Sequence, residues 1–188
     1  MSGHKFNEKK IDKLNNPDRL NILNVSEVCK FFGLDEVRVM VEIGAGTGLF
    51  AEAFLYSIPE SICYGLDISL AMLDWMSEHR VPRLNGRLEV GLMEESKIPL
   101  EDDFADLIFM ITVHHELEEP VALLKDAYRV LKPGGKIMIA DWRQDARPND
   151  RDHFYEIEEI KLHLQDAGFQ EIREFTDSEK LNCIGAVK

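Results

Sequence analysis

Apolar residues in this chain fall into two kinds of stretch, which alternate over most of its length. Short, nearly continuous apolar runs such as Val37 to Ile43 are typical of strands buried on both faces of a parallel sheet. The stretches between them mix apolar and polar residues, as helices that cover a sheet do. The pattern predicts strands at 37–43, 62–66, 87–91, 106–112 and 136–141, with helices at 49–56, 69–78, 120–131 and 155–167.

Strands that alternate with helices form βαβ units, so we predict an α/β fold with a doubly wound, mostly parallel sheet and helices on both faces. The last two apolar stretches, 169–176 and 181–187, have no helix between them. We therefore expect them to pair as antiparallel strands at the C-terminal edge of the sheet. Ligands of such sheets bind in the crevice at the carboxyl ends of the central strands.

The N-terminal part lacks this alternation. Asn16 and Pro17 predict the start of a short helix that reaches about Leu23, and a second helix is expected from Asn24 to Gly33. We expect a single domain over residues 1–188, with an N-terminal helical segment at 1–33 and a Rossmann-like core at 34–188. Residues 4–6 of that segment are a possible lid over the crevice.

Charge and cysteine content narrow the classes of partner and compartment. The 188 residues carry a formal net charge of −13, which disfavours binding to nucleic acid or to an anionic membrane surface. Cys29, Cys63 and Cys183 are widely spaced and odd in number, which favours a reducing compartment over a disulfide framework. The first 16 residues contain no apolar signal segment, and no apolar run approaches ~18 residues. We expect a cytoplasmic protein without a membrane span.

A glycine-rich turn follows the first predicted strand. Gly44, Gly46 and Gly48 allow a sharp turn and let a ligand approach backbone N–H groups closely. Asp67 ends the next strand, where a carboxylate can accept hydrogen bonds from ribose hydroxyls. This spacing alone leaves open a nicotinamide cofactor or another adenosine ligand. Glu42 favours the second, since a carboxylate there would repel a pyrophosphate and attract a cationic amino acid group.

Five motifs in order extend this pattern, namely VEIGAGTG at 41–48, GLDIS at 65–69, MEESKIPL at 93–100, VHHELEEP at 113–120 and RVLKPGGKIMIAD at 129–141. Together they resemble the class I S-adenosylmethionine-dependent methyltransferases, and in particular the small-molecule group that includes quinone-biosynthesis C-methyltransferases. The resemblance implies a seven-stranded sheet whose C-terminal strand is antiparallel. It also implies S-adenosyl-L-methionine as the cofactor and a small molecule as the methyl acceptor.

The resemblance assigns cofactor-binding roles residue by residue. Glu42 and the turn with Gly44, Ala45, Gly46 and Gly48 would hold the methionine moiety, and Asp67 the ribose. At the adenine end it implies Ile68, Met72 and the acidic pair Glu94 and Glu95. Members of the family usually have an Asp after a Gly at that pair, so which of the two glutamates meets the adenine stays open.

Methyl transfer from a sulfonium needs chiefly alignment, and it needs a base only when the acceptor must lose a proton. His114 and His115 follow the fourth predicted strand, beside the crevice. Because neighbouring strand residues point to opposite faces, we expect only one of them to face the ligand, and we favour His115 as the catalytic base. We expect no metal site, since adjacent histidines diverge on a strand.

Two other function classes stay in view beside a methyltransferase. A protein with this cofactor site could bind the cofactor without catalysis, as an adapter or sensor for a partner. A nicotinamide-dependent dehydrogenase is less favoured, because Glu42 suits a pyrophosphate poorly and few residues are left for a substrate domain.

Overall fold

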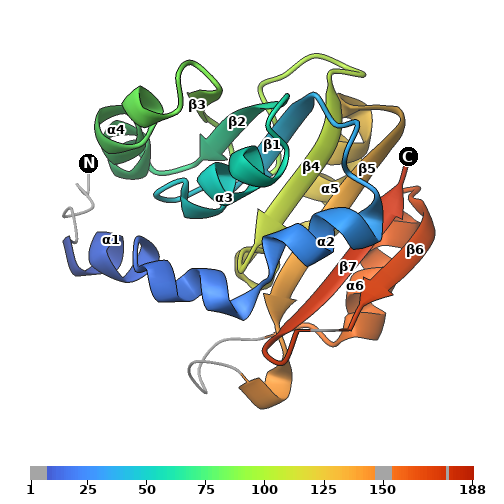
Figure 1. The fold of residues 1–188 in the computed structure, drawn as a ribbon. Coiled ribbons are helices and arrows are strands. Elements are labelled where there is room, and N and C mark those ends of the chain that lie inside the picture. Colours follow the sequence, from blue (N-terminus) through green and yellow to red (C-terminus); the bar gives the residue numbers. More distant parts are fainter. Residues whose placement is uncertain (1–7, 147–153, 177) are drawn as a thin grey trace.

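The computed structural model describes residues 8–146, 154–176 and 178–188. A sheet of seven strands lies at its centre (Figure 1). The strands are β1 (Val39–Ile43), β2 (Ile62–Asp67), β3 (Leu88–Leu92), β4 (Ala105–Ile111), β5 (Leu131–Trp142), β6 (Gln170–Phe175) and β7 (Leu181–Val187). The α-helices are α1 (Glu8–Leu14), α2 (Val25–Phe32), α3 (Leu49–Ser57), α4 (Leu70–His79), α5 (Pro120–Val130) and α6 (Ile157–Asp166).

The order of the strands is β3-β2-β1-β4-β5-β7-β6. The five strands from β3 to β5 are parallel, whereas β7 is antiparallel to both β5 and β6. The predicted fold class, with its antiparallel C-terminal strand, is therefore confirmed. The chain reverses its winding between β1 and β4, so the carboxyl ends of these two strands define the crevice at which such sheets bind ligands.

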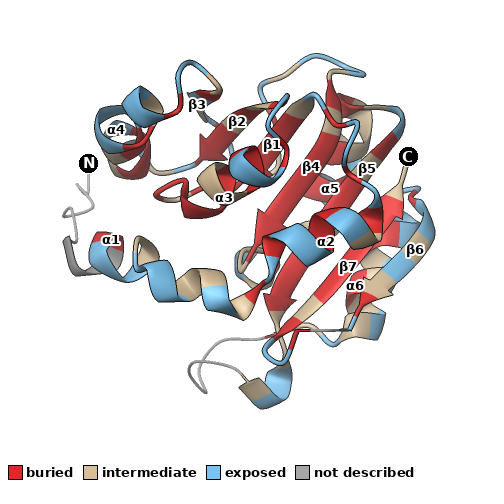
Figure 2. Cartoon of the chain, in the orientation of Figure 1, coloured by how far each residue is buried: buried red, intermediate tan, exposed pale blue. Residues whose placement is uncertain are grey.

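Side chains of the sheet alternate between two apolar cores, one on each face. Met40 and Phe109 pack into the core that α2, α3 and α4 cover. Their neighbours in the sequence, Val41 and Ile108, pack into the core that α5 and α6 cover. Apart from Val39 and Asp106 near their starts, the residues of β1 and β4 are buried (Figure 2), which explains why these strands appear in the sequence as nearly continuous apolar runs.

The structure differs from the sequence-based prediction in the region that joins α5 to β5. We predicted a helix to residue 131 and a strand from 136, but α5 ends at Val130 and β5 begins at Leu131. Leu131 pairs with Ala105, and the register then shifts before Leu107. Gly134 lies inside β5 with a φ of +77°. The Pro-Gly-Gly sequence between the predicted helix and strand is therefore an irregular part of the strand.

The first part of the N-terminal segment reaches the carboxyl-end crevice through Leu14 and Arg19, whereas α2 packs on one face of the sheet. The first described element of the segment, α1, was missed by the sequence-based interpretation, and the residues from Pro17 to Ile22 form the 3-10 helix η1. Ile11 of α1 is buried. A helix of seven residues has little stability of its own, so contacts with the rest of the fold stabilise it. The possible lid at residues 4–6 lies outside the described residues.

Candidate functional site

A cavity of about 810 Å³ lies at the carboxyl ends of β1, β2 and β4. Its volume is within the range of small-molecule and cofactor sites. The wall also takes residues from the N-terminal segment, the glycine turn with the start of α3, the start of α4, the segment after β3 and the segment after β4. The wall residues include Leu14, Arg19, Glu42, Gly44, Ala45, Gly46, Thr47, Phe50, Asp67, Ile68, Met72, Asp74, Met93, Glu95, Thr112, Val113, Glu116 and Leu117.

The glycine turn connects β1 to α3, and its three glycines all have positive φ angles of +66°, +55° and +68° at Gly44, Gly46 and Gly48. A Cβ on Gly44 would lie 2.6 Å from a methyl carbon of Val113, so both conformation and space require glycine there. Gly44, Ala45 and Gly46 line the cavity. Gly48 does not line it; a Cβ there would meet the sulfur of Met76 at 2.7 Å, so its role is packing.

Asp67 ends β2 with its carboxylate fixed by the backbone on both sides. Oδ2 accepts a hydrogen bond of 2.8 Å from the N–H of Gly46, and Oδ1 accepts one of 2.8 Å from the N–H of Ser69. Only 8% of the residue is exposed. Each carboxylate oxygen has a second lone pair, so a rigidly held acceptor faces the cavity at the position that the sequence predicts for a ribose.

Glu42 lies at the end of β1 and is buried. Its Oε2 accepts a hydrogen bond of 2.9 Å from the N–H of Ala51 in α3. Burial raises the pKa of this carboxyl to about 8, although the Ala51 N–H and the positive charge of Arg19 act in the opposite direction. The site therefore lacks a counter-charge that would ionise Glu42 fully at neutral pH. A cationic group in the cavity would supply it.

The predicted adenine end of the cavity is apolar on one side and acidic on the other. Ile68 lies on the wall and is 64% exposed, although it is a large apolar residue. Met72, Met93 and Glu95 also line this end. Glu94 does not line the cavity and instead forms an isolated bridge with Lys97. Of the two glutamates that the sequence left open, the structure therefore places Glu95 at the cavity.

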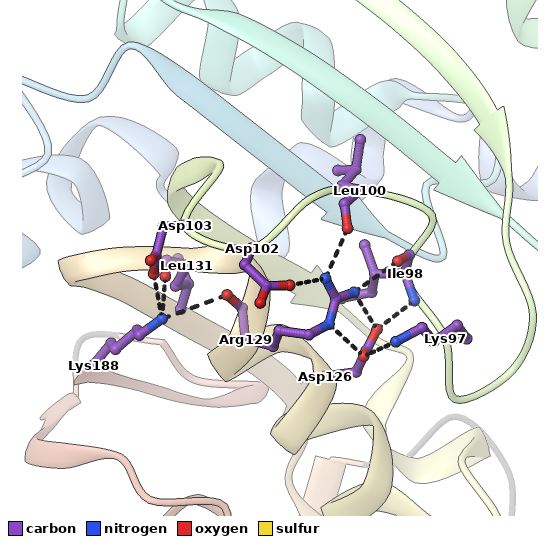
Figure 3. A network of polar contacts seen from close by, with 9 residues as sticks. All are labelled: Lys97, Ile98, Leu100, Asp102, Asp103, Asp126, Arg129, Leu131 and Lys188. Carbon is purple, nitrogen blue, oxygen red and sulfur yellow. Dashed lines mark hydrogen bonds and ion pairs between the residues drawn. The ribbon is translucent and has the colours of Figure 1, made fainter.

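A polar network holds the segment that carries Glu95 (Figure 3). The carboxylate of Asp126 in α5 accepts hydrogen bonds from Lys97 Nζ at 2.6 Å, from the N–H of Ile98 at 2.7 Å and from Arg129 Nε at 2.9 Å. Arg129 also donates to Asp102 and to two backbone carbonyls of the same segment. Burial opposes ionisation of Asp126, but these hydrogen bonds outweigh it and lower its pKa to about 2. The network anchors the adenine-end segment to α5.

The histidines after β4 do not lie on a strand. β4 ends at Ile111, and His114 to Glu116 form a 3-10 turn, so the expectation that strand alternation separates the two histidines was wrong. The backbone N–H of His115 donates to Asp141 Oδ2 at 2.8 Å, and the ring Nδ1 of His115 lies 2.7 Å from Asp141 Oδ1. His115 does not line the cavity, although Glu116 beside it does, with Oε1 3.9 Å from His115 Nε2.

His114 points into the protein and is fully buried. Its Nε2 lies 3.1 Å from Nδ1 of His163 in α6. Burial lowers the pKa of His114 to about 4, against the raising effect of Asp141, so the ring is neutral at physiological pH. This contact joins the segment after β4 to α6 and gives His114 a structural role.

Two wall residues from the N-terminal segment, Leu14 and Arg19, were missed by the sequence-based interpretation. Leu14 lies over the glycine turn, since a Cβ on Gly46 would be 3.6 Å from its Cδ1. Arg19 donates to the carbonyl of Leu14 and to the hydroxyl of Thr112. The sequence offered no signal for the contacts with Gly46 and Thr112, because these residues are far from Leu14 and Arg19 in the chain.

The cavity wall fits the donor S-adenosyl-L-methionine. The glycines leave backbone N–H groups accessible, Asp67 offers ribose acceptors, and Glu42 needs a cation. Thr47 in the same turn also lines the cavity, and its buried hydroxyl has no hydrogen-bond partner among the residues described, so it is available to a polar group of a ligand. Each predicted cofactor-binding residue except Gly48 and Glu94 lines the cavity.

A seven-stranded sheet of this order, with a glycine turn after β1 and an acid at the end of β2, defines a class I S-adenosylmethionine-dependent methyltransferase. Comparison with known proteins supports this class. A family of sequences described as a methyltransferase domain matches residues 41–139. That match covers more than half of the chain, which belongs to the methyltransferase domain family.

Similar proteins include one of known structure. A SAM-dependent methyltransferase from Aquifex aeolicus, known from a crystal structure, has 32% sequence identity to this chain. The two structures superpose with a TM-score of 0.86 over 97% of this chain and 99% of that chain. Malonyl-[acyl-carrier protein] O-methyltransferase from Methylococcus capsulatus is 34% identical over 54% of this chain and 36% of its own length. Ubiquinone/menaquinone biosynthesis C-methyltransferase from Cupriavidus metallidurans is 27% identical over 65% and 50%. This chain thus spans half or less of these two curated relatives.

Within 8–146, 154–176 and 178–188, no group of three or more His, Cys, Asp or Glu side chains is arranged to hold a metal ion. In the same part of the chain, every helix is too short or too polar to cross a membrane.

Proposed function

We propose that this protein transfers the methyl group of S-adenosyl-L-methionine to a small-molecule acceptor that enters the cavity. The observation that carries the proposal is that one cavity joins the glycine turn, Glu42 and Asp67 to the segment after β4. When bound, the donor supplies a methyl group on a positively charged sulfur. The acidic wall suits this charge, and the glycine turn, Glu42 and Asp67 hold the donor in one orientation.

Alignment is the main contribution that this chain makes to the reaction. A nucleophile, the methyl carbon and the sulfur must be collinear, and orientation of this kind can contribute about 7–11 kcal/mol to the rate. The wall at the donor site is rigid, because Asp67 is held by two backbone N–H groups and Glu42 by a third. Asp126 and Arg129 hold the adenine-end segment in the same way.

We propose His115 as the base for an acceptor that must lose a proton. Its Nδ1 faces the Asp141 carboxylate, which favours the tautomer with the proton on Nδ1 and leaves Nε2 as the basic nitrogen. Nε2 lies on the side of the ring that faces Glu116, a cavity-wall residue. Asp141 also stabilises the imidazolium that forms when Nε2 takes the proton.

The acceptor class is inferred from the chemistry of the wall and from the relatives. The two curated relatives described above are named for an acyl group on a carrier protein and for quinones. A net charge of −13 opposes nucleic acid as a partner. We propose that the protein works in the cytoplasm, since Cys29, Cys63 and Cys183 are buried and free.

Two measurements test this function. Calorimetric titration with S-adenosylhomocysteine and, separately, with NADH should show binding of the first ligand alone. Incubation with S-adenosylmethionine and a panel of small carboxylates, amines, phenols and quinones should then release S-adenosylhomocysteine with at least one acceptor. Tight binding without turnover on any acceptor would contradict catalysis and favour an adapter that binds the donor.

A further inference from the structure

The charges on the cavity wall are unequal. Arg19 is the only basic residue on the wall among the residues described, and its guanidinium already donates to the carbonyl of Leu14 and to the hydroxyl of Thr112. Five acidic residues share this wall, namely Glu42, Asp67, Asp74, Glu95 and Glu116. A wall with this balance of charge attracts cations and repels anions.

The five wall acids lack the ion pairs that other carboxylates of this protein form. Asp126 pairs with Lys97 at 2.6 Å, for example, and Asp106 pairs with Lys132 at 2.7 Å. In the part of the chain that the structure describes, no Lys or Arg lies within ion-pair distance of a wall acid. The negative charge of the wall is therefore left for ligands to balance.

The donor accounts for only part of this charge. Under the proposed function Glu42 faces its ammonium, Asp67 its ribose and Glu95 its adenine, and Asp74 belongs to α4, the helix that also brings Met72 to the adenine end. The donor carries one net positive charge, because its sulfonium and ammonium outnumber its carboxylate by one. Glu116 is the wall acid that the donor leaves unmatched.

Glu116 lies towards the glycine turn, at the end of the cavity that the proposed function gives to the sulfonium. Val113 packs against that turn, since a Cβ on Gly44 would be 2.6 Å from one of its methyl carbons. The N–H of Glu116 donates to the carbonyl of Val113 at 2.9 Å within the 3-10 turn at 114–116. Residues three apart in such a turn project from the same side. Val113 and Glu116 accordingly both line the cavity.

The carboxylate of Glu116 is accessible to a ligand and lies beside the proposed base. Its side chain is 68% exposed, and Oε1 is 3.9 Å from Nε2 of His115. The His115 ring is fixed by Asp141 at Nδ1 and packs against Phe154, with the ring centres 4.7 Å apart. One end of the cavity thus combines a carboxylate with a positioned imidazole.

We propose that the methyl acceptor is a small amine, which enters as its ammonium and is held by Glu116. The carboxylate accepts a charge-assisted hydrogen bond from the ammonium, and Nε2 of His115 takes one of its other protons. The nitrogen lone pair then forms the bond to the methyl carbon, while the carbon–sulfur bond breaks and its electron pair stays on sulfur. The products are the N-methylated ammonium and S-adenosylhomocysteine, and His115 passes its proton to water.

This inference rests on the proposed function and deepens it, because it names the class of acceptor. A carboxylate or phosphate acceptor would bring a negative charge to an acidic wall, and juxtaposed like charges oppose binding. A neutral alcohol, phenol or quinone would gain no ionic contact from Glu116. An amine that also carries a carboxylate should be a poorer acceptor than the same amine without it.

The first experiment compares acceptors that share a carbon skeleton and differ in one functional group. Benzyl, phenethyl, imidazolylethyl and hexyl skeletons each carry an amine, a hydroxyl or a carboxylate, and release of S-adenosylhomocysteine is measured for every compound. At least one amine should be methylated with a kcat/KM about tenfold or more above that of its hydroxyl and carboxylate counterparts. Mass spectrometry should place the methyl group on nitrogen.

The second experiment tests Glu116 with the best amine. Glu116→Gln should raise KM roughly tenfold, as expected for loss of a hydrogen bond to a charged group, and leave kcat nearly unchanged. Glu116→Lys, which reverses the charge, should raise KM further. Glu118→Gln is the matched control, because Glu118 is also exposed but does not line the cavity; it should leave KM unchanged. All three variants should keep the wild-type dissociation constant for S-adenosylhomocysteine.

The outcomes separate this inference from the function on which it rests. Methylation of alcohols, phenols, quinones or carboxylates with every amine inert overturns the amine class and leaves the proposed function standing. An unchanged KM in Glu116→Gln, or an equal rise in Glu118→Gln, also overturns the inference, since Glu116 would then not hold the acceptor. Failure of wild-type protein to bind S-adenosylhomocysteine, or to turn over any acceptor at all, would instead contradict the proposed function.

Discussion

Replacement of Asp67 by alanine tests the donor site at its most rigid point. In the structure this carboxylate accepts hydrogen bonds from the N–H groups of Gly46 and Ser69, and it still has lone pairs for two ribose hydroxyls. Asp67→Ala removes all of these acceptors at once. We expect two separate effects, one on donor affinity and one on the stability of the unliganded protein.

The two effects have different magnitudes. Hydrogen bonds to a charged acceptor contribute about 1.5–3 kcal/mol each, so loss of the ribose contacts should weaken S-adenosylhomocysteine by more than about tenfold. The two backbone N–H groups lose their partner at a cavity wall that water reaches, so each should cost about 1 kcal/mol of folding free energy. For a chain of this length, a total of about 2 kcal/mol lowers Tm by roughly 4–8 °C.

Calorimetry and thermal unfolding, each with and without S-adenosylhomocysteine, separate these effects. Asp67→Asn keeps one carbonyl oxygen and should lose less stability than Asp67→Ala while still losing affinity. Asp35→Ala is the control, since Asp35 is exposed and lies outside the cavity; it should change neither quantity. An Asp67→Ala protein that remains folded with an unchanged dissociation constant would refute the assignment of this carboxylate to the ribose.

Three further predictions follow from the same contacts. The pKa of Glu42 is raised to about 8, so its carboxyl is largely protonated at pH 7. The affinity for S-adenosylhomocysteine should therefore rise about fivefold between pH 7 and pH 8, as the Glu42 carboxyl ionises. Glu42→Gln should remove this rise and leave adenosine binding nearly unchanged, and a rise that persists in the variant would contradict the role of Glu42. For an acceptor that loses a proton, His115→Ala should lower kcat by roughly 10²–10⁴-fold and leave donor affinity unchanged. The wild-type rate should rise with pH, because only neutral imidazole is a base. His114→Ala should lower Tm rather than kcat, and a full kcat in His115→Ala would show that His115 is structural. Asp126→Ala should lower Tm by roughly 4–8 °C and weaken S-adenosylhomocysteine severalfold. Since its folded pKa is about 2, the stability that Asp126 contributes should be present above about pH 4 and lost as the pH falls towards 2, and an unchanged Tm at pH 7 would count against the network.

Much of the fold could be predicted because buried parallel strands leave a strong signal. The runs that became β1, β2 and β4 are apolar on both faces, and the structure packs Met40 and Val41 into opposite cores. The glycine turn and the acids at the strand ends were also visible, since each residue type there has a local physical requirement. Their positive φ angles and hydrogen bonds confirm the turn and the placement of Asp67.

The remaining features depend on tertiary contacts that no local pattern contains. α1 was missed because it is short and depends on buried residues such as Ile11. The turn at His114 and His115 was taken for strand, although contacts with His163 and Asp141 fix both rings. Arg19 was missed for the same reason, because its partner Thr112 is 93 residues away in the chain.

Labelled methyl transfer into a mixture of metabolites tests the central claim most directly. Purified protein is incubated with S-adenosylmethionine that carries a deuterated methyl group and with a small-molecule extract of cells, and products are identified by mass spectrometry. We expect at least one small molecule to gain the deuterated methyl group with wild-type protein, and its yield to be strongly reduced with Asp67→Ala. Equal labelling by both proteins, or no labelled small molecule despite tight binding of S-adenosylhomocysteine, would contradict the central claim.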